Sequence, residues 1–99
     1  MTPDSTAAFM YGATMLLAID DEGFDNERTC PNDRDAVLGA CEMILDADVV
    51  TPSDIALRNF AVHTALVIAL PRGHDVTRAA VRDWHRARAE FTALQIAAG

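Results

Sequence analysis

The stretch VTPSDIALRNFAVHTALVIALPRG, residues 50–73, decides the fold of this 99-residue chain, because it is apolar around almost its whole circumference. Its beginning carries the signals of a helix start: Thr51 stands at the N-cap position, Pro52 at the first helical position and Asp54 at the third. The Pro-Arg-Gly at its end stops a helix. The sequence therefore predicts a helix over residues 52–70.

This helix has two apolar sides, and a small domain can cover only one of them. Phe60 shares its side with Ala56, Leu57, Thr64, Val67 and Ile68, whereas Ile55, Val62, Ala65, Leu66 and Ala69 lie on the other side. The helix predicted over residues 3–20 also has two apolar sides, and Tyr11, Met15 and Ala18 lie on the second one. We therefore expect a homodimer that buries the spare sides of these two helices, with those eight residues at its interface.

Two further helices complete the predicted fold. Helical spacing of apolar residues places them at residues 32–47 and 75–97, and an acidic loop at residues 21–31 separates the first helix from the second. No segment shows the alternation of a strand. Because the other connections are short, we predict an all-α fold in one domain: a small antiparallel four-helix bundle made of two helical hairpins.

The last helix combines an apolar stripe with a basic row. Trp84 belongs to the stripe with Ala80, Ala87, Phe91, Leu94 and Ala98, so it is predicted to lie in the core. Arg78, Arg82 and Arg86 form a row on the opposite side. Nucleic-acid binding normally needs a strongly basic domain, and this chain has a net charge of -7 and a pI near 4.6. We therefore expect no nucleic-acid partner.

Charge is distributed unevenly along the chain. Residues 1–54 contain twelve acidic residues and two Arg, and residues 55–99 contain three acidic residues and six Arg. The basic row can neutralise the acidic half within the fold or across a dimer, or the acidic half can bind a basic partner. The candidate partner-binding residues are Asp20, Asp21, Glu22, Asp25, Glu27, Arg78, Arg82 and Arg86.

The sequence offers little support for catalysis or metal binding. The His residues at positions 63, 74 and 85 are eleven apart, whereas two metal ligands on one helix need three or four residues of separation. We expect His63 to be a buried imidazole with its hydrogen bonds satisfied, and His74 to belong to a helix start. The acidic loop does not match the register of a calcium loop. No catalytic residue, metal site or cofactor is predicted.

The two cysteines are predicted to be free thiols. Cys30 and Cys41 are eleven residues apart, and Cys41 falls on the apolar side of the helix over residues 32–47. At about 1.5 Å of rise per residue, their Cα atoms lie roughly 16 Å apart, beyond the roughly 7 Å that a disulfide can bridge. Cys41 is expected to be buried as a small apolar side chain.

We expect a cytoplasmic protein that neither enters nor binds a membrane. No apolar stretch approaches the roughly 18 residues of a membrane span, and Asp4 stands where a signal peptide carries positive charge. The expected function is a non-enzymatic protein-binding module, a homodimeric regulator or adaptor with an unidentified protein partner. Its size and composition, in which every basic residue is Arg, suggest a phage or mobile element acting on a host protein. Two alternatives stay open: an acidic inhibitor that imitates nucleic acid, and a small helical metal-dependent hydrolase.

Overall fold

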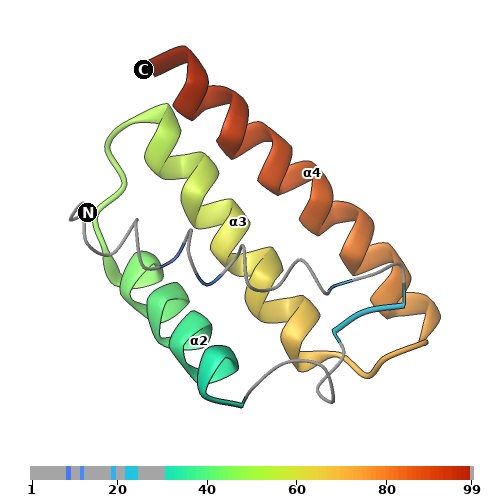
Figure 1. Ribbon diagram of the computed structural model, residues 1–99. Helices are drawn as coiled ribbons and strands as arrows, with labels where there is room; N and C mark the ends of the chain where they lie inside the picture. Colours follow the sequence, from blue (N-terminus) through green and yellow to red (C-terminus); the bar gives the residue numbers. More distant parts are fainter. Residues whose placement is uncertain (1–8, 10–11, 13–18, 20–21, 25–30, 99) are drawn as a thin grey trace.

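The computed structural model describes residues 9, 12, 19, 22–24 and 31–98, and this part of the chain contains three α-helices and no strand (Figure 1). The helices are α2 (Pro31–Asp46), α3 (Pro52–Ala69) and α4 (Asp75–Ala98). Their ends differ from the predicted ends by one residue at most. The predicted all-helical class is confirmed. None of the described helices is both long and apolar enough to cross a membrane.

The helix predicted over residues 3–20 lies mostly outside the described residues. Within it, Phe9 and Gly12 have helical backbone, whereas Ile19, next to the predicted end, does not. The described part of the chain therefore contains three of the four predicted helices, and Phe9 and Ile19 add buried side chains to their core.

The predicted start of α3 is confirmed as a capping box. The Thr51 hydroxyl accepts a hydrogen bond from the Asp54 backbone N–H at 3.1 Å, and the Asp54 carboxylate accepts one from the Thr51 backbone N–H at 3.2 Å. A third bond reaches the carboxylate from the Val50 N–H at 3.3 Å. The backbone hydrogen bonds from Thr51 and Val50 lower the pKa of Asp54, because they stabilise its charged form.

The three helices form a layer in which α3 lies between α2 and α4 (Figure 1). Phe60 projects from the inner side of α3 into the core, where its ring centroid lies 5.0 Å from that of Phe9, 5.7 Å from that of Trp84 and 6.3 Å from that of Phe91. All four rings are buried. Aromatic pairs at these separations stabilise a core beyond the area that they bury.

One buried hydrogen bond joins α3 to α4. Trp84 is fully buried, as predicted, and its indole N–H donates to the Thr64 hydroxyl at 3.0 Å. The same hydroxyl donates to the Phe60 carbonyl oxygen at 2.8 Å. Because both side chains are inaccessible to water, this bond satisfies polar atoms that have no solvent alternative.

The turn between α3 and α4 holds residues 22–24 against the helices. The Gly73 N–H donates to the Glu22 carbonyl oxygen at 2.7 Å, and the Arg72 guanidinium lies 3.4 Å from the Glu22 carboxylate. Gly23 has a φ of 122°, a conformation that favours glycine, and a Cβ there would lie 2.6 Å from Cγ2 of Thr77. Phe24 follows with a buried ring.

Candidate interaction surface

The outer side of α3 exposes large apolar side chains in the single chain. Ile55 is 59% exposed, and Val62 and Leu66 are each 45% exposed. Of the other residues predicted at a dimer interface, Ala69 is exposed and Ala65 is half-buried, while Tyr11, Met15 and Ala18 lie outside the described residues. The inner side of α3 is buried, including Ala56, Leu57, Phe60, Thr64, Val67 and Ile68, as predicted.

Five exposed residues of α3 follow a heptad spacing. Ile55, Asn59, Val62, Leu66 and Ala69, which we name the outer stripe, are separated by four, three, four and three residues and are all exposed. This alternation is that of the a and d positions through which helices pair along their length, with Asn59 and Leu66 as the two a positions. Sequence reasoning missed Asn59 because it considered only the apolar residues of the helix.

A shallow groove runs along one flank of the outer stripe, between α3 and α4. Its lining residues are Pro52, Ile55, Ala56 and Asn59 from α3 with Glu90, Ala93 and Leu94 from α4. The groove is apolar apart from Asn59 and Glu90. The outer stripe therefore continues toward α4 as a wider apolar surface, with an exposed carboxylate at its border.

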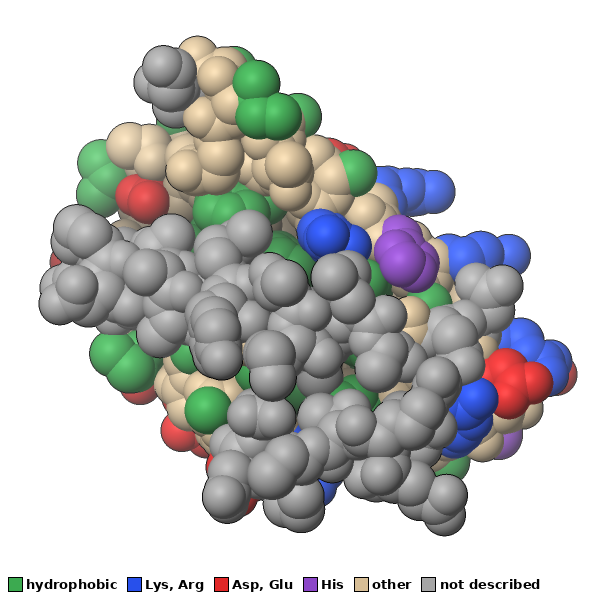
Figure 2. Space-filling view, viewed as in Figure 1, with side chains coloured by type: hydrophobic (Ala, Val, Ile, Leu, Met, Phe, Trp, Pro, Cys, Tyr) green, Lys and Arg blue, Asp and Glu red, His purple; other side chains and the backbone are tan. Residues whose placement is uncertain are grey.

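The predicted basic row lies on the solvent side of α4, away from the core. Arg78, Arg82 and Arg86 are all exposed, and Figure 2 shows basic side chains spaced along the edge that α4 forms. Arg78 is paired with Asp75 at 3.0 Å. A fourth basic side chain, Arg88, lies 5.8 Å from the centroid of the Trp84 ring, a cation–π contact that sequence reasoning did not foresee.

Among the predicted acidic partner-binding residues, the structure describes only Glu22. Its carboxylate is paired with Arg72, so Glu22 helps to fix residues 22–24 against the α3–α4 turn. Asp20, Asp21, Asp25 and Glu27 lie outside the described residues. On α2, Asp35, Glu42 and Asp46 are exposed opposite the buried side formed by Val37, Ala40, Cys41 and Ile44, as the sequence predicts.

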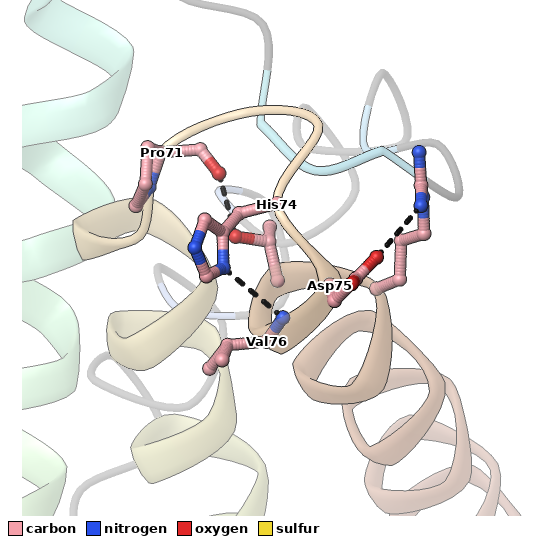
Figure 3. Close-up of polar contacts among 6 residues, drawn as sticks. Pro71, His74, Asp75 and Val76 are labelled. Atoms are coloured by element: carbon pink, nitrogen blue, oxygen red, sulfur yellow. Dashed lines mark hydrogen bonds and ion pairs between the residues drawn. The ribbon is translucent and has the colours of Figure 1, made fainter.

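His74 caps the start of α4, as the sequence predicts (Figure 3). Its Nδ1 accepts a hydrogen bond from the Val76 N–H at 3.2 Å, and its carbonyl oxygen accepts one from the Arg78 N–H at 3.0 Å. The Thr77 hydroxyl donates to the Pro71 carbonyl oxygen in the same turn. The His74 ring therefore satisfies a backbone donor of the first turn, which is a structural role.

The other two histidines occupy different surroundings. Nδ1 of His63 is buried and has no hydrogen-bond partner among the described residues, so the prediction of a satisfied imidazole is wrong for this atom. The His85 ring lies edge-on to Trp84, with 4.9 Å between ring centroids. Within the described ranges, no three His, Cys, Asp or Glu side chains lie close enough to share a metal ion.

Cys41 is a buried free thiol on the inner side of α2, as predicted. Burial, assisted by the negative charge of Glu42, raises its pKa to about 12. Because the thiolate is the reactive form, this side chain behaves as an apolar core residue at neutral pH. Cys30 lies outside the described residues.

Comparison of the chain with protein-family models, with curated proteins and with solved structures finds no match.

Proposed function

We propose that this chain is a protein-binding module without enzymatic activity. It pairs with a second copy of itself through the outer stripe of α3. The pair serves as a small regulator or adaptor for another protein. The observation that carries the proposal is the exposure of Ile55, Val62 and Leu66 along one side of a helix whose other side is buried.

The energetic argument rests on the apolar area that these side chains leave in water. Each apolar Å² removed from water contributes about 25 cal/mol, so burying the exposed parts of Ile55, Val62 and Leu66 in both copies favours association. The heptad spacing lets the side chains of one helix interlock with those of another helix. Isolated exposed apolar residues occur on most proteins, whereas an aligned set of this kind is typical of an interaction site.

Matched valine substitutions test the pairing. Val62→Glu places a charge at the centre of the outer stripe. Val76→Glu makes the same change at the start of α4, where Val76 is 57% exposed. The two hydrogen bonds between α3 and α4, Thr64–Trp84 and Ser53–Gln95, put Val76 level with Arg72, beyond the last residue of the outer stripe. An unpaired buried charge costs several kcal/mol, so Val62→Glu should raise the dimer Kd by roughly 100-fold, or about 3 kcal/mol. Val76→Glu should leave the Kd unchanged.

Light scattering behind a sizing column measures the result. The wild-type chain should show twice its 10.7 kDa mass at micromolar concentration, and Val62→Glu should show the single-chain mass with unchanged circular dichroism. A wild-type mass of one chain at these concentrations would overturn the proposal. Equal behaviour of the two glutamate variants would show that any pairing uses another surface.

The exposed carboxylates of α2 favour a second candidate function, an acidic inhibitor that imitates nucleic acid and occupies a basic groove of a host protein. Asp35, Glu42 and Asp46 are seven and four residues apart, so their negative charges lie along one exposed side of α2. Binding through such charges weakens steeply as salt rises from about 50 to 200 mM, whereas apolar docking changes little. Titration of a DNA-binding partner at the two salt concentrations distinguishes these candidates.

A further inference from the structure

Another groove lies along the carboxyl-terminal half of α4. It has a volume of about 430 Å³, and its lining residues are His85, Arg88, Ala89, Thr92, Ala93 and Ile96. We infer that this groove binds a small amphipathic carboxylate, a compound with one carboxylate head and an alkyl tail of medium length, with the head at Arg88 and the tail over Ile96. The site does not depend on the proposed pairing through the outer stripe of α3.

The lining of this groove changes from basic to apolar along the helix. His85 and Arg88 lie at the end nearest the start of α4. Ala93 and Ile96 lie at the other end, where Ile96 is 76% exposed, and Thr92 contributes a hydroxyl between the two ends. Arg88 and Ile96 are eight residues apart, which is about 12 Å along the helix axis. A ligand that fits this groove therefore has one polar end and one apolar end.

Trp84 holds the two polar groups of the basic end. The guanidinium carbon of Arg88 lies 5.8 Å from the centroid of the Trp84 ring, and the centroid of the His85 ring lies 4.9 Å from the same ring. Trp84 is itself fixed, because it is fully buried and donates a hydrogen bond to Thr64. Side chains that are held in position before a ligand arrives lose less conformational entropy when it binds.

The Arg88 guanidinium has N–H donors to offer an anion. It makes no hydrogen bond or ion pair with any described residue. A planar guanidinium matches the two oxygens of a carboxylate with two parallel hydrogen bonds. Arg88 is half-buried, and the attraction between opposite charges is stronger there than in open water. The head of the ligand is therefore assigned to Arg88.

The two acidic side chains nearest to this groove along α4 lie on the other side of the helix. Asp83 is two residues from His85, and Glu90 is two residues from Arg88, so each acid is about 200° around the helix from a polar residue of the groove. Arg82, which is exposed three residues before His85, lies on the groove side. The groove is therefore locally basic although the chain has a net charge of -7, and it favours an anion over a cation.

Titration with decanoate, at concentrations below those at which it forms micelles, tests the site. Trp84 is the single tryptophan of the chain and contacts both residues of the basic end, so its fluorescence should change and saturate with a Kd below about 1 mM. Acetate, which lacks the tail, and decyltrimethylammonium, which carries the opposite charge, should each bind at least about tenfold more weakly. No saturable change with decanoate, or equal binding of either control compound, would overturn the inference.

Substitution of Arg88 tests the head of the site, with isothermal titration calorimetry as a measurement that does not depend on Trp84. Arg88→Gln removes the charge and should raise the Kd for decanoate at least about tenfold. Arg86→Gln is the matched control, because Arg86 is exposed on α4 and does not line the groove, and it should leave the Kd unchanged. Equal affinities of the two variants would overturn the assignment of the head to Arg88.

Substitution of Ile96 tests the tail of the site without touching the core. Ile96→Asp places a negative charge at the apolar end and should also raise the Kd for decanoate at least about tenfold. Val76→Asp makes a comparable change at an exposed position outside the groove and should leave the Kd unchanged. Circular dichroism checks that both variants keep their helices. An Ile96→Asp protein that binds decanoate as tightly as the wild type would overturn the inferred site.

Discussion

Replacement of Thr64 by Val should separate the contribution of the α3–α4 hydrogen bond from that of the surrounding apolar core. The substitution conserves side-chain volume and removes only the hydroxyl that accepts the Trp84 N–H and donates to the Phe60 carbonyl oxygen. The Trp84 side chain is fully buried, so no water can replace the lost acceptor. The indole N–H is left without a partner in the core.

The expected cost follows from that unsatisfied donor. A buried polar group that loses its partner costs about 1–3 kcal/mol, and we expect about 2 kcal/mol for Thr64→Val. For a domain of this size, that loss lowers the Tm by roughly 10 °C. Thr64→Ser keeps the hydroxyl and loses one buried methyl group, which should cost about 1 kcal/mol.

Urea unfolding followed by the fluorescence of Trp84, the single tryptophan of the chain, measures these free energies. Thr92→Val is the matched control, because Thr92 is exposed on α4 and the same substitution there should change the free energy of unfolding by less than about 0.5 kcal/mol. A Thr64→Val protein as stable as the wild type, or a serine variant less stable than the valine variant, would refute the reasoning.

Two glycines and one carboxylate give further predictions. Gly23→Ala should destabilise the fold by about 1–3 kcal/mol, because φ is 122° there and the new methyl would lie 2.6 Å from Thr77. Gly39→Ala in α2 should instead stabilise the fold by roughly 0.5–1 kcal/mol, because no atom lies within 4 Å of the added Cβ. Thermal unfolding compares the two, and a less stable Gly39→Ala than Gly23→Ala would contradict the assignment. The pKa of Asp54 is lowered from 3.8 in the folded chain, so its stabilising contribution is present above that value and is lost as the pH falls through the folded pKa. Urea unfolding at pH 7 and pH 3 should therefore show that Asp54→Asn costs stability mainly at pH 7, and an equal cost at both pH values would rule out this charge effect.

The local features of the fold were predictable because their signals lie close together in the sequence. The capping box of α3 needs only Thr51 and Asp54, which are three residues apart, and the inner side of α3 follows from helical periodicity around Phe60. The burial of Trp84 follows from the stripe on α4 in the same way. The Trp84–Thr64 bond joins residues twenty apart, and periodicity carries no information about such pairs.

The surface was predictable only in part, for the same reason. Periodicity identified Ile55, Val62 and Leu66 as the spare side of α3, and the structure confirms their exposure in the single chain. It could not show which flank of this side faces α4, so the groove that Asn59 shares with Glu90 required the arrangement of both helices. Nδ1 of His63, which has no partner in the described part of the chain, was missed because burial of one ring atom depends on neighbours that a helical wheel does not include.

The two sides of α3 separate the residues that keep the chain folded from those through which the pairing is proposed. Phe60, Thr64 and Val67 are held by the rings and the hydrogen bond of the core, so most exchanges there cost stability. Exchanges at Ile55, Asn59 or Leu66 change a surface that the subunit does not need for its own packing. If the proposed pairing uses that side, a few substitutions there can redirect partner choice while the chain still folds, and α3 is then a suitable position for engineering pairs that do not bind one another.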